Sequence, residues 1–451
     1  MCPFRKENRL TPFEEYMFWD ETPAFPMSSW QKLRFSGRLD LDLLRESLAA
    51  AALRHPLMTA RVALVRGKPY WELRDKEPEI VPFENAGDEK ILPMPDIRNA
   101  SGLKVYYRAY EEEGRERTDL CFAVHHSVSD GVGILGFMEE IFLNYAARKG
   151  SAIPPEAYPE ISADSMAERQ APQQTWRRYF KLLTYGIKST RNMLLHDAKP
   201  FLPIKKIDYD TPNTRPVLYD AFTLSRQETR AYIAEAKKRG WSLNDLLMRD
   251  FFVSCGDFER KFVPKLNRWI RVAMPIDMRT RETPPLFAAN VVSMVFLDRR
   301  PSQITGGEEF GEGIHRETQW IKKTDQGYTL LVNLRSKRNT FGGLKIVLHG
   351  RRCWSTTVLS NLGIIFGKTP LPRTEDGRLI VGDTVLDTFC GMPPVRAKTF
   401  TGWGVWTYAG RLGLAMRYDE RYLSDEQSAF AFGACRDHVT ATIGGAGAAR
   451  Q

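Results

Sequence analysis

The sequence predicts an α/β protein built of two lobes, each a mixed sheet with helices. Segments with the alternating apolar pattern of strands are interleaved, in both halves of the chain, with segments that carry the 3.6-residue spacing of helices. A proline-punctuated stretch over 151–172 lies between the halves. Of the 451 residues, 43% are hydrophobic and 11% aromatic, which is enough to fill large buried cores. We expect an N-terminal lobe over 1–175, a crossover helix and linker over 176–210, and a C-terminal lobe over 211–451.

The N-terminal lobe is predicted to combine two helices with two pairs of strands. Leucine and alanine spacing indicates the first helix, which ends before Pro56, and two alternating segments around Gly67 indicate a hairpin. Helical spacing of apolar residues begins again after Gly131. In chain order the expected elements are a helix over 40–55, hairpin strands over 59–66 and 68–73, strands over 103–110 and 120–124, and a helix over 131–145.

The crossover is predicted to be an amphipathic helix over 176–195. Its apolar face carries Trp176, Phe180 and Ile187, and its other positions carry basic residues, a run that continues to Lys206. Such a helix either packs as a crossover with a solvated basic face or lies on a membrane surface. In the C-terminal lobe the expected elements are strands over 217–224, 269–274, 290–297 and 356–360, helices over 225–239, 242–253 and 307–323, a hairpin over 405–408 and 412–418, and a helix over 425–440.

The balance of charges indicates either a basic soluble protein or a protein with an anionic partner. The net charge is +10, the isoelectric point is near 9.2, and the charge is spread over both halves. An anionic partner would be a phosphate-bearing cofactor, an acidic protein or a membrane surface, the last reached through the basic stretch from Arg177 to Lys206. No nucleic-acid-binding motif is present, so nucleic acid is not expected as a partner.

Cysteine spacing and hydropathy point to a reduced, cytoplasmic protein, which would be peripheral to a membrane if the basic stretch binds one. The six cysteines are far apart and form no C-x-x-C pair, which argues against a disulfide framework and against a zinc knuckle. The first residues have no apolar core of signal-peptide length, and no apolar run approaches the roughly 20 residues of a membrane span.

The most informative segment is His125-His126-Ser127-Val128-Ser129-Asp130-Gly131. It follows an apolar strand and leads into a helix. With only 7 histidines in the chain, a chance match to H-H-x-x-x-D-G is expected in under about one in a thousand sequences of ordinary composition. A single histidine at a strand end is usually structural, but a pair followed by an acid and a glycine indicates a functional site.

The chemistry of imidazole suggests different tasks for the two histidines. Neighbouring side chains of a strand point to opposite faces, so one histidine should face the core while the other projects toward a cleft. A neutral imidazole with a pKa near 6.5 can take the proton of a hydroxyl or amine that attacks a carbonyl. Asp130 is too close in sequence to be assumed a triad partner, and a short loop could turn it toward an arginine that braces the turn.

Two other interpretations of this segment, a dinucleotide site and a metal site, are not supported by the sequence. Gly131–Gly136 matches G-x-G-x-x-G, but a dinucleotide site needs a second strand with an acid about 20 residues on, and that region is a proline loop. We expect a tight turn at Gly131 and close packing at Gly133 and Gly136. Histidines on opposite faces of a strand do not easily share a metal ion, and the sequence holds no H-E-x-x-H and no G-x-S-x-G. We therefore expect no metal and no permanently bound cofactor.

At these residues the chain resembles the condensation-domain and chloramphenicol-acetyltransferase-like acyltransferases, whose shared motif is H-H-x-x-x-D-G. That superfamily includes peptide condensation domains, wax ester synthases and alcohol acetyltransferases. Further segments resemble it at Leu10–Glu14, Ser242–Asp245, Ala273–Arg279 with the following Asn290, and Ser360–Gly363, which is similar to the Ser-Asn loop of ester-forming members. The echo of a D-F-G-W-G motif at 401–404 lacks its acid, which argues against the plant BAHD branch.

The resemblance implies two chloramphenicol-acetyltransferase-like lobes with the active-site tunnel between them. His126 would be the catalytic general base, and no covalent acyl-enzyme would form. The acyl donor would be a thioester of coenzyme A or of the phosphopantetheine arm of a carrier protein, whose phosphate suits the positive net charge. The acceptor would enter from the other side.

The resemblance also assigns supporting residues. Asp130, paired with Arg279, would be structural, as would His125, and Gly131 would keep the channel open near the base. Ser360 and Asn361 would hydrogen-bond the developing oxyanion, unless their loop merely caps a strand.

We therefore predict an acyltransferase that moves an acyl group from a thioester to an alcohol or lipid hydroxyl. General-base assistance is worth roughly 10²–10⁴ in rate, so positioning in the tunnel must supply most of the remainder. Two alternatives stay open. One is an amide-forming condensation enzyme that acts in trans on carrier-bound substrates, since the chain holds no adenylation or carrier domain. The other is a catalytically silent member that binds a hydrophobic ligand.

Overall fold

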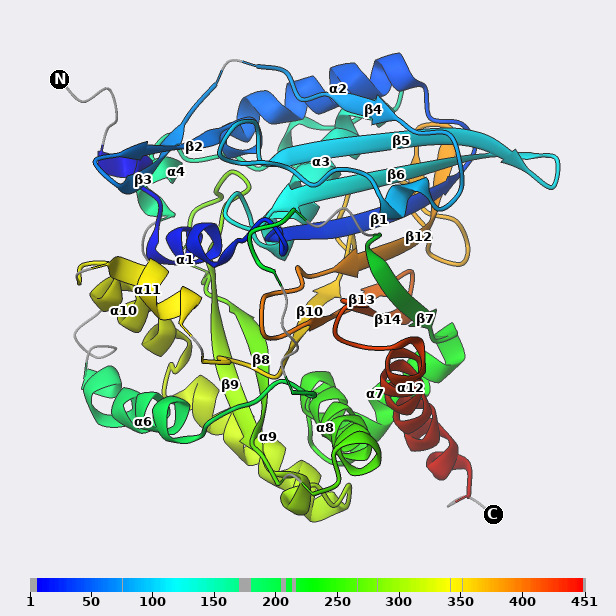
Figure 1. Cartoon of the computed structure of the whole chain (residues 1–451). Coiled ribbons are helices and arrows are strands. Elements are labelled where there is room, and N and C mark those ends of the chain that lie inside the picture. Colours follow the sequence, from blue (N-terminus) through cyan, green and yellow to red (C-terminus); the bar gives the residue numbers. More distant parts are fainter. Residues whose placement is uncertain are drawn as a thin grey trace.

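Two six-stranded sheets organise the chain, one in each lobe (Figure 1). The computed structural model describes residues 6–74, 76–169, 180–203, 208–212, 216–265, 267–281, 283–340, 342–350 and 352–448. In Figure 1 the first sheet lies in the upper half of the molecule and the second sheet in the lower half. The predicted α/β class with two lobes is confirmed.

The first sheet has the strand order β11-β12-β1-β6-β5-β4. Its strands are β1 (Ser28–Ser36), β4 (Ile80–Pro82), β5 (Leu103–Glu112), β6 (Arg115–His125), β11 (Ile380–Val381) and β12 (Thr384–Met392). β1 lies between β6 and β12 and pairs antiparallel with both. Helices α2 (Leu41–Arg54) and α3 (Gly131–Arg148) cover one face of this sheet (Figure 1).

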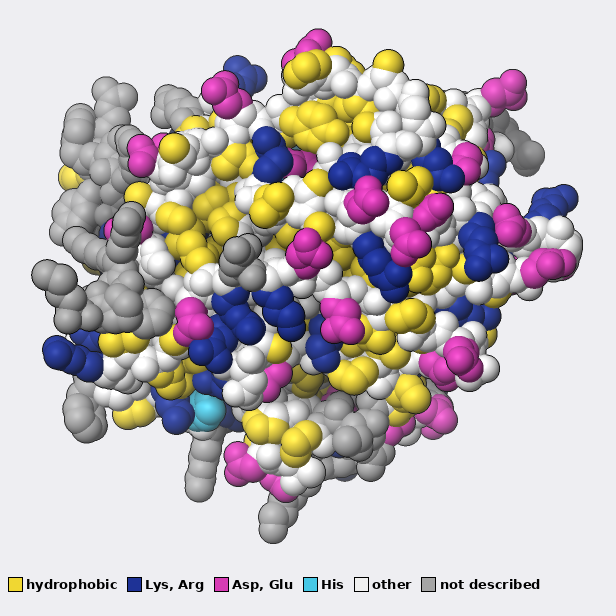
Figure 2. Space-filling model, turned by 90° about the horizontal axis from the view of Figure 1, so that it is seen from above, with side chains coloured by type: hydrophobic (Ala, Val, Ile, Leu, Met, Phe, Trp, Pro, Cys, Tyr) yellow, Lys and Arg dark blue, Asp and Glu magenta, His cyan; other side chains and the backbone are white. Residues whose placement is uncertain are grey.

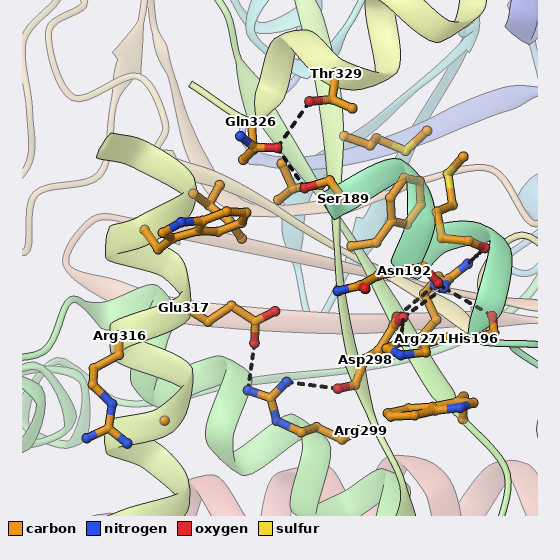
Figure 3. A pocket seen from close by; sticks show the side chains of 18 of the residues that line it. Ser189, Asn192, His196, Arg271, Asp298, Arg299, Arg316, Glu317, Gln326 and Thr329 are labelled. Atoms are coloured by element: carbon orange, nitrogen blue, oxygen red, sulfur yellow. Dashed lines mark hydrogen bonds and ion pairs between the residues drawn. The ribbon is translucent and has the colours of Figure 1, made fainter. Parts of the chain in front are cut away.

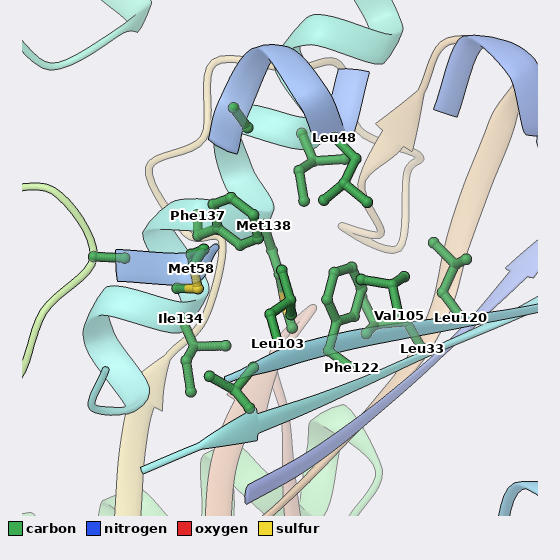
Figure 4. Close-up of a cluster of buried hydrophobic side chains, with 14 of the residues drawn as sticks. Leu33, Leu48, Met58, Leu103, Val105, Leu120, Phe122, Ile134, Phe137 and Met138 are labelled. Atoms are coloured by element: carbon green, nitrogen blue, oxygen red, sulfur yellow. The ribbon is translucent and has the colours of Figure 1, made fainter. Parts of the chain in front are cut away.

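An apolar core fills the space between the first sheet and these two helices (Figure 4). Its side chains include Leu33, Leu48, Met58, Leu103, Val105, Leu120, Phe122, Ile134, Phe137 and Met138. Burial of a side chain of this kind contributes about 1.5–3 kcal/mol. Phe122 of β6 and Phe137 of α3 are both buried in it. The core therefore fixes the end of β6 relative to the start of α3, and the histidine motif lies between them.

The second sheet has the strand order β7-β14-β13-β10-β8-β9. Its strands are β7 (Leu218–Thr223), β8 (Ile270–Asp277), β9 (Val292–Arg299), β10 (Thr357–Ile364), β13 (Thr401–Tyr408) and β14 (Arg411–Tyr418). β10 runs parallel to β8 and β13, and the other pairs are antiparallel. Its helices are α7 (Arg226–Lys238), α8 (Leu243–Phe262), α9 (Glu308–Lys323) and α12 (Asp425–Ala448).

Smaller elements complete the lobes. They are the hairpin β2 (Arg61–Val65) and β3 (Lys68–Glu72), the helices α1 (Pro12–Asp20), α4 (Ser165–Glu168), α6 (Ile187–Leu195), α10 (Gly327–Lys337) and α11 (Gly343–His349), and the single turns η1 (Lys6–Asn8), η2 (Pro56–Met58), η3 (Asp88–Lys90), η4 (Pro155–Ala157), η5 (Leu182–Gly186, a π-helical turn) and η6 (Pro301–Gln303). α1 packs against α10 and α11. It begins at a capping box, in which the Glu14 N–H donates to Thr11 Oγ1 at 3.2 Å.

The helices and strands predicted from periodicity are present where the structure describes them, and several are longer. β6 begins at Arg115 rather than at 120, and α8 continues to Phe262 rather than ending near 253. β1 is not predicted, because it is a central strand with buried polar residues (Ser28, Ser29 and Gln31) and does not alternate.

The sheets do not follow the predicted lobe boundaries strictly. β11 and β12 lie within 211–451 but join the sheet of the first lobe, where β12 pairs with β1. Strand pairing between segments so far apart leaves no trace in local periodicity. Of the predicted crossover helix, the structure describes residues 180–195, which include η5 and α6, while Trp176, Arg177 and Lys206 lie outside the described residues.

Charges of both signs are mixed on the face shown in Figure 2, which is seen from above. Lys and Arg side chains lie beside Asp and Glu side chains over the coloured part of this face. This mixture agrees with a positive net charge that is spread along the sequence. None of the helices in the described part of the chain is long and apolar enough to cross a membrane.

Candidate active site

His125 is the last residue of β6 and faces the interior. It is fully buried, and its Nδ1 accepts a hydrogen bond from the Ser127 N–H at 3.1 Å. Its Nε2 lies 3.3 Å from a carboxylate oxygen of Glu21. The β1–β6 pairing, which places Ser28 opposite His125, holds the end of the strand in place. His125 is thus the core-facing histidine expected from strand geometry.

His126 turns to the other side and is only partly buried. Its N–H donates to the carbonyl of Met27 at 2.7 Å, and its ring lies 6.2 Å from the ring of Phe13 in α1. Burial of the imidazole lowers the pKa of His126 below its ordinary value of 6.5, although the nearby Asp130 carboxylate acts in the opposite direction. The imidazole is therefore neutral at neutral pH, which is the form that can accept a proton.

Asn290, from the segment before β9, holds the backbone of the histidine motif. Its Nδ2 donates to the carbonyl oxygens of His126, at 2.7 Å, and of Ser127, at 2.8 Å. Within the described part of the chain, His126 Nδ1 and Asn290 Oδ1 are buried atoms without a hydrogen-bond partner. The Asn290 side chain also acts on the His126 imidazole, whose pKa it raises against the effect of burial. The sequence showed Asn290 only through its resemblance to the family, because nothing in its local pattern marks it.

Asp130 begins α3 and ties the two lobes together. Its Oδ1 accepts from the Gly133 N–H at 2.9 Å, which caps the helix, and its Oδ2 accepts from the Val291 N–H at 2.7 Å. The guanidinium of Arg279 donates to both oxygens, at 3.0 and 3.2 Å. Asp130 and Arg279 thus form the expected ion pair, and Asp130 points away from a triad geometry toward this brace.

A segment of the second lobe, over 285–291, inserts into the first lobe. Phe287, Ala288 and Ala289 are buried in the core of the first lobe. The Ala288 N–H donates to Nδ1 of His55 at 2.7 Å, and the Asp130 N–H donates to the carbonyl of Ala289 at 3.4 Å. Sequence reasoning missed His55, since a single histidine at the end of a helix carries no distinctive signal.

Of the roles predicted for the three glycines that follow Asp130, only the close packing of Gly133 agrees with the structure. Gly131 has no positive φ, so it does not form a strained turn; an added Cβ would lie 2.3 Å from Cδ2 of Leu362 in β10. An added Cβ at Gly133 would lie 3.0 Å from the backbone of Ala289, as expected for close packing. At Gly136 nothing lies within 4 Å, so the prediction of close packing there is wrong.

Ser360 and Asn361 lie in β10, where the pairing with β13 is interrupted by a bulge. Asn361 Nδ2 donates to Oδ1 of Asn244 at 2.6 Å, and its own Oδ1 accepts from the Gly363 N–H at 2.8 Å. These bonds fix the shape of the bulge, whose Leu362 contacts the position of Gly131. The structure therefore brings this loop to the start of α3, and the expected oxyanion contact of Ser360 and Asn361 stays a prediction.

A separate cavity of about 540 Å³ lies in the second lobe between α6, β9, α9 and α10 (Figure 3). Four of its charged groups pair with one another: Arg271 with Asp298 at 2.7 Å, and Arg299 with Glu317 at 2.7 Å. His126 does not line it. In the part of the chain that the structure describes, no three His, Cys, Asp or Glu side chains gather as a metal site.

Similarity to known sequences is weak but extends over much of the chain. No family model matches it. The uncharacterized protein Rv2305 of Mycobacterium tuberculosis is 24% identical over 315 residues, which cover 67% of this chain and 68% of that protein. CymA, a probable nonribosomal peptide synthetase of Salinispora arenicola, is 27% identical over 142 residues, which cover 30% of this chain and 2% of CymA.

Solved structures match the chain over almost its full length. The first condensation domain of the CDA synthetase has a TM-score of 0.63 at 14% identity and covers 96% of this chain and 95% of that chain. The chain has the condensation-domain fold. TRI3, the trichothecene 15-O-acetyltransferase of Fusarium sporotrichioides, shares this fold with a TM-score of 0.67 at 12% identity, over 96% of this chain and 94% of that chain. The resemblance inferred from the histidine motif is confirmed at the level of the fold.

The condensation-domain fold is shared by proteins with different named activities, a condensation domain and an O-acetyltransferase. At 12–14% identity the likeness concerns architecture and not a particular reaction. Which reaction this chain performs must be argued from its own residues.

Proposed function

We propose that the protein is an acyltransferase that moves an acyl group from a thioester to the hydroxyl of an alcohol or lipid, with His126 as general base. The observation that carries the proposal is the neutral His126 imidazole, whose pKa burial lowers and whose backbone Asn290 fixes from the other lobe. A base of this kind must be unprotonated at working pH and held in one place. The lowered pKa of His126 and the anchoring of its backbone by Asn290 support this assignment.

In the proposed reaction the imidazole accepts the proton of the acceptor hydroxyl while its oxygen attacks the thioester carbonyl. The new C–O bond forms, the C–S bond breaks, and the imidazolium returns the proton to the departing thiolate. No covalent acyl-enzyme is required. The tunnel expected between the lobes would align donor and acceptor, and that alignment would supply most of the acceleration.

The proposed donor is an acyl thioester of coenzyme A or of a carrier-protein phosphopantetheine arm. The positive net charge of +10 supports a donor that carries phosphate. Ser360 and Asn361 are proposed to stabilise the oxyanion; the Asn361 amide nitrogen has a second hydrogen besides the one donated to Asn244. A membrane surface is proposed as a further partner, through the basic stretch from Arg177 to Lys206.

Amide formation on carrier-bound substrates is the second candidate. The similarity to the CDA synthetase condensation domain and to part of CymA favours it. The same general base would then take the proton from an amine. Ester and amide formation thus differ in the acceptor rather than in the base.

The test measures thiol release from acyl-coenzyme A donors, acetyl to palmitoyl, with alcohol and amine acceptors, and identifies the product by mass spectrometry. The proposal expects acceptor-dependent release and an alkaline-labile ester. A stable amide product would favour the second candidate. If no donor reacts on coenzyme A but the same acyl groups react on a carrier protein, the donor assignment moves to the carrier. If neither coenzyme A donors nor carrier-protein donors react, we would assign the protein as a catalytically silent member that binds a ligand.

A further inference from the structure

We propose that residues 180–195 together with α10 form a docking surface for a bilayer that contains anionic phospholipids. The proposal specifies which kind of membrane the protein would bind, and it rests on the membrane partner named in the proposed function. It does not depend on the acyl transfer, because it is argued from exposed side chains of the second lobe. We call these residues the docking surface.

The segment over 180–195 exposes large apolar side chains. Phe180 is 63% exposed, Ile187 is 65% exposed and Leu195 is 70% exposed, with Leu194 beside them at 51%. Ile187 and Leu194 are seven residues apart, so they lie on the same face of α6, two turns from each other. A soluble protein rarely gathers several such side chains on one short helix unless a partner covers them.

An apolar groove adjoins these side chains. It has a volume of about 510 Å³ and lies between the 180–195 segment and α10, with Leu182, Ile187, Leu194, Leu195 and Val332 in its walls. Asn333 of α10 donates from Nδ2 to Thr190 Oγ1 at 3.1 Å and so joins the two helices. The 540 Å³ cavity is lined by other residues of this segment, among them Ser189 and Asn192 (Figure 3). α6 lies at the lower left of Figure 1.

The same segments carry positive charge without carboxylates. The sequence has no Asp or Glu over 169–196 or over 326–374. Arg191 lines the groove, and Arg335 lies one helical turn after Val332; both are exposed. Among the described residues neither of these arginines forms an ion pair, whereas Lys181 pairs with Asp325 at 2.9 Å. Two cations thus stay unneutralised at the border of the apolar groove.

A bilayer with anionic lipids fits this arrangement better than a protein does. A helix that lies in the membrane interface presents apolar side chains on one side and Lys or Arg beside them, so that the chains enter the acyl region and the cations meet the headgroups. A protein partner would need an acidic patch whose charges match these arginines at defined places. Only one sign is present over these two segments, as expected for a surface of uniform negative charge.

The docking surface is connected to the candidate active site by packing. α10 and α11 pack against α1, and Leu334 and Leu344 share an apolar cluster with Phe13 of α1. Phe13 in turn lies 6.2 Å from the ring of His126. A bilayer bound at α6 and α10 would therefore lie one layer of helices away from the proposed general base, a suitable position for a hydrophobic acceptor.

The test is co-sedimentation of the full-length protein with phosphatidylcholine vesicles, with and without 30% phosphatidylglycerol, in the absence of donor and acceptor. We expect binding to the anionic vesicles that weakens in 0.5 M salt. The variant Ile187→Ser/Leu195→Ser should lower the partition coefficient at least about tenfold, because two apolar side chains no longer enter the bilayer. Arg191→Glu/Arg335→Glu should lower it at least about fivefold.

Matched controls come from the first lobe. Leu53 of α2 is 81% exposed and Arg45 is an exposed arginine of the same helix, so Leu53→Ser and Arg45→Glu should bind vesicles as the wild type does. His126→Ala should also bind normally, which separates this proposal from the reaction. Equal binding to neutral vesicles, or no loss in the two docking-surface variants, would overturn the proposal. If the protein binds no vesicles and the docking-surface variants instead lose binding to an acidic protein, the surface would be assigned to that protein partner.

Discussion

Among single residues, His126 is the one whose ionisation sets the pH dependence of the proposed reaction. Burial lowers its pKa below 6.5. We predict that kcat/KM decreases toward acid pH with a midpoint below 6.5 and a slope of one proton. Initial rates in a buffer series from pH 5 to 8 measure this. An acid limb with its midpoint above 6.5 would contradict the assignment.

The lowered pKa of His126 also makes the unfolding free energy depend on pH. A base whose pKa is lowered on folding binds fewer protons in the folded than in the unfolded chain. The contribution of His126 to the unfolding free energy is therefore fully present above pH 6.5, the ordinary pKa of histidine. It is lost progressively as the pH falls below 6.5 toward the lowered pKa of the folded state. In His126→Gln this part of the acid sensitivity should be absent, which urea unfolding at pH 5.5 and 7.5 would show.

Asp130 is predicted to be structural as well as necessary for activity. Asp130→Asn keeps one oxygen acceptor but loses the charge that Arg279 and two backbone N–H groups bind, at a cost of about 2–4 kcal/mol in unfolding free energy. Asp277 is a matched control, because it pairs with the same arginine at 3.0 Å but is 44% exposed. Asp277→Asn should cost less than about 1 kcal/mol. An Asp130→Asn protein that is as stable as the wild type would show that Asp130 does not brace the lobes.

Among the secondary-structure elements, β12 and β13 meet where the two sheets approach each other. β12 belongs to the first sheet and β13 to the second. A Cβ added at Gly404 of β13 would lie 1.9 Å from the carbonyl oxygen of Gly391 of β12, so only glycine fits there. This contact holds the two sheets close together at this point.

Two glycine substitutions test this contact. Gly404→Ala should lower the unfolding free energy by about 3 kcal/mol, because backbone atoms must move to relieve the overlap. Gly136 lies within α3 with nothing within 4 Å of an added Cβ, so Gly136→Ala should be neutral or stabilise by up to about 1 kcal/mol. Urea unfolding measures both. Equal stability of the two variants would show that the sheets do not need this close approach.

How far the elements could be predicted follows from how local their signals are. α2 and α3 combine regular apolar spacing with clear ends, and the sequence predicts both. α10 and α11 were not predicted, although both pack against α1. β1 was missed because its buried polar residues hide the strand pattern.

The candidate site was predicted in part for a similar reason. His125, His126 and Asp130 are neighbours in sequence, and their spacing carries the signal. Their partners come from distant segments: Asn290 binds the His126 carbonyl across 164 positions, and His55 meets Ala288 across 233. Such contacts follow from the tertiary fold, and only the resemblance to a family pointed to Asn290 and Arg279.

For the molecule as a whole, the arrangement of the lobes explains why the site needs both of them. The first lobe supplies the histidines and Asp130, and the second supplies Asn290 and Arg279. Arg417 of β14 adds a further link by donating to the carbonyl of Ser28 at 2.8 Å. Neither lobe alone contains the proposed base together with the groups that position it.

One measurement decides whether His126 performs acyl transfer: the acceptor-dependent rate of thiol release by wild type and by His126→Ala, beside their melting temperatures. We predict that the variant loses roughly 10²–10⁴ in rate, because general-base assistance is removed, while its melting temperature stays close to that of the wild type, since the His126 side chain is only partly buried. A variant that folds and retains the wild-type rate would contradict His126 as the general base.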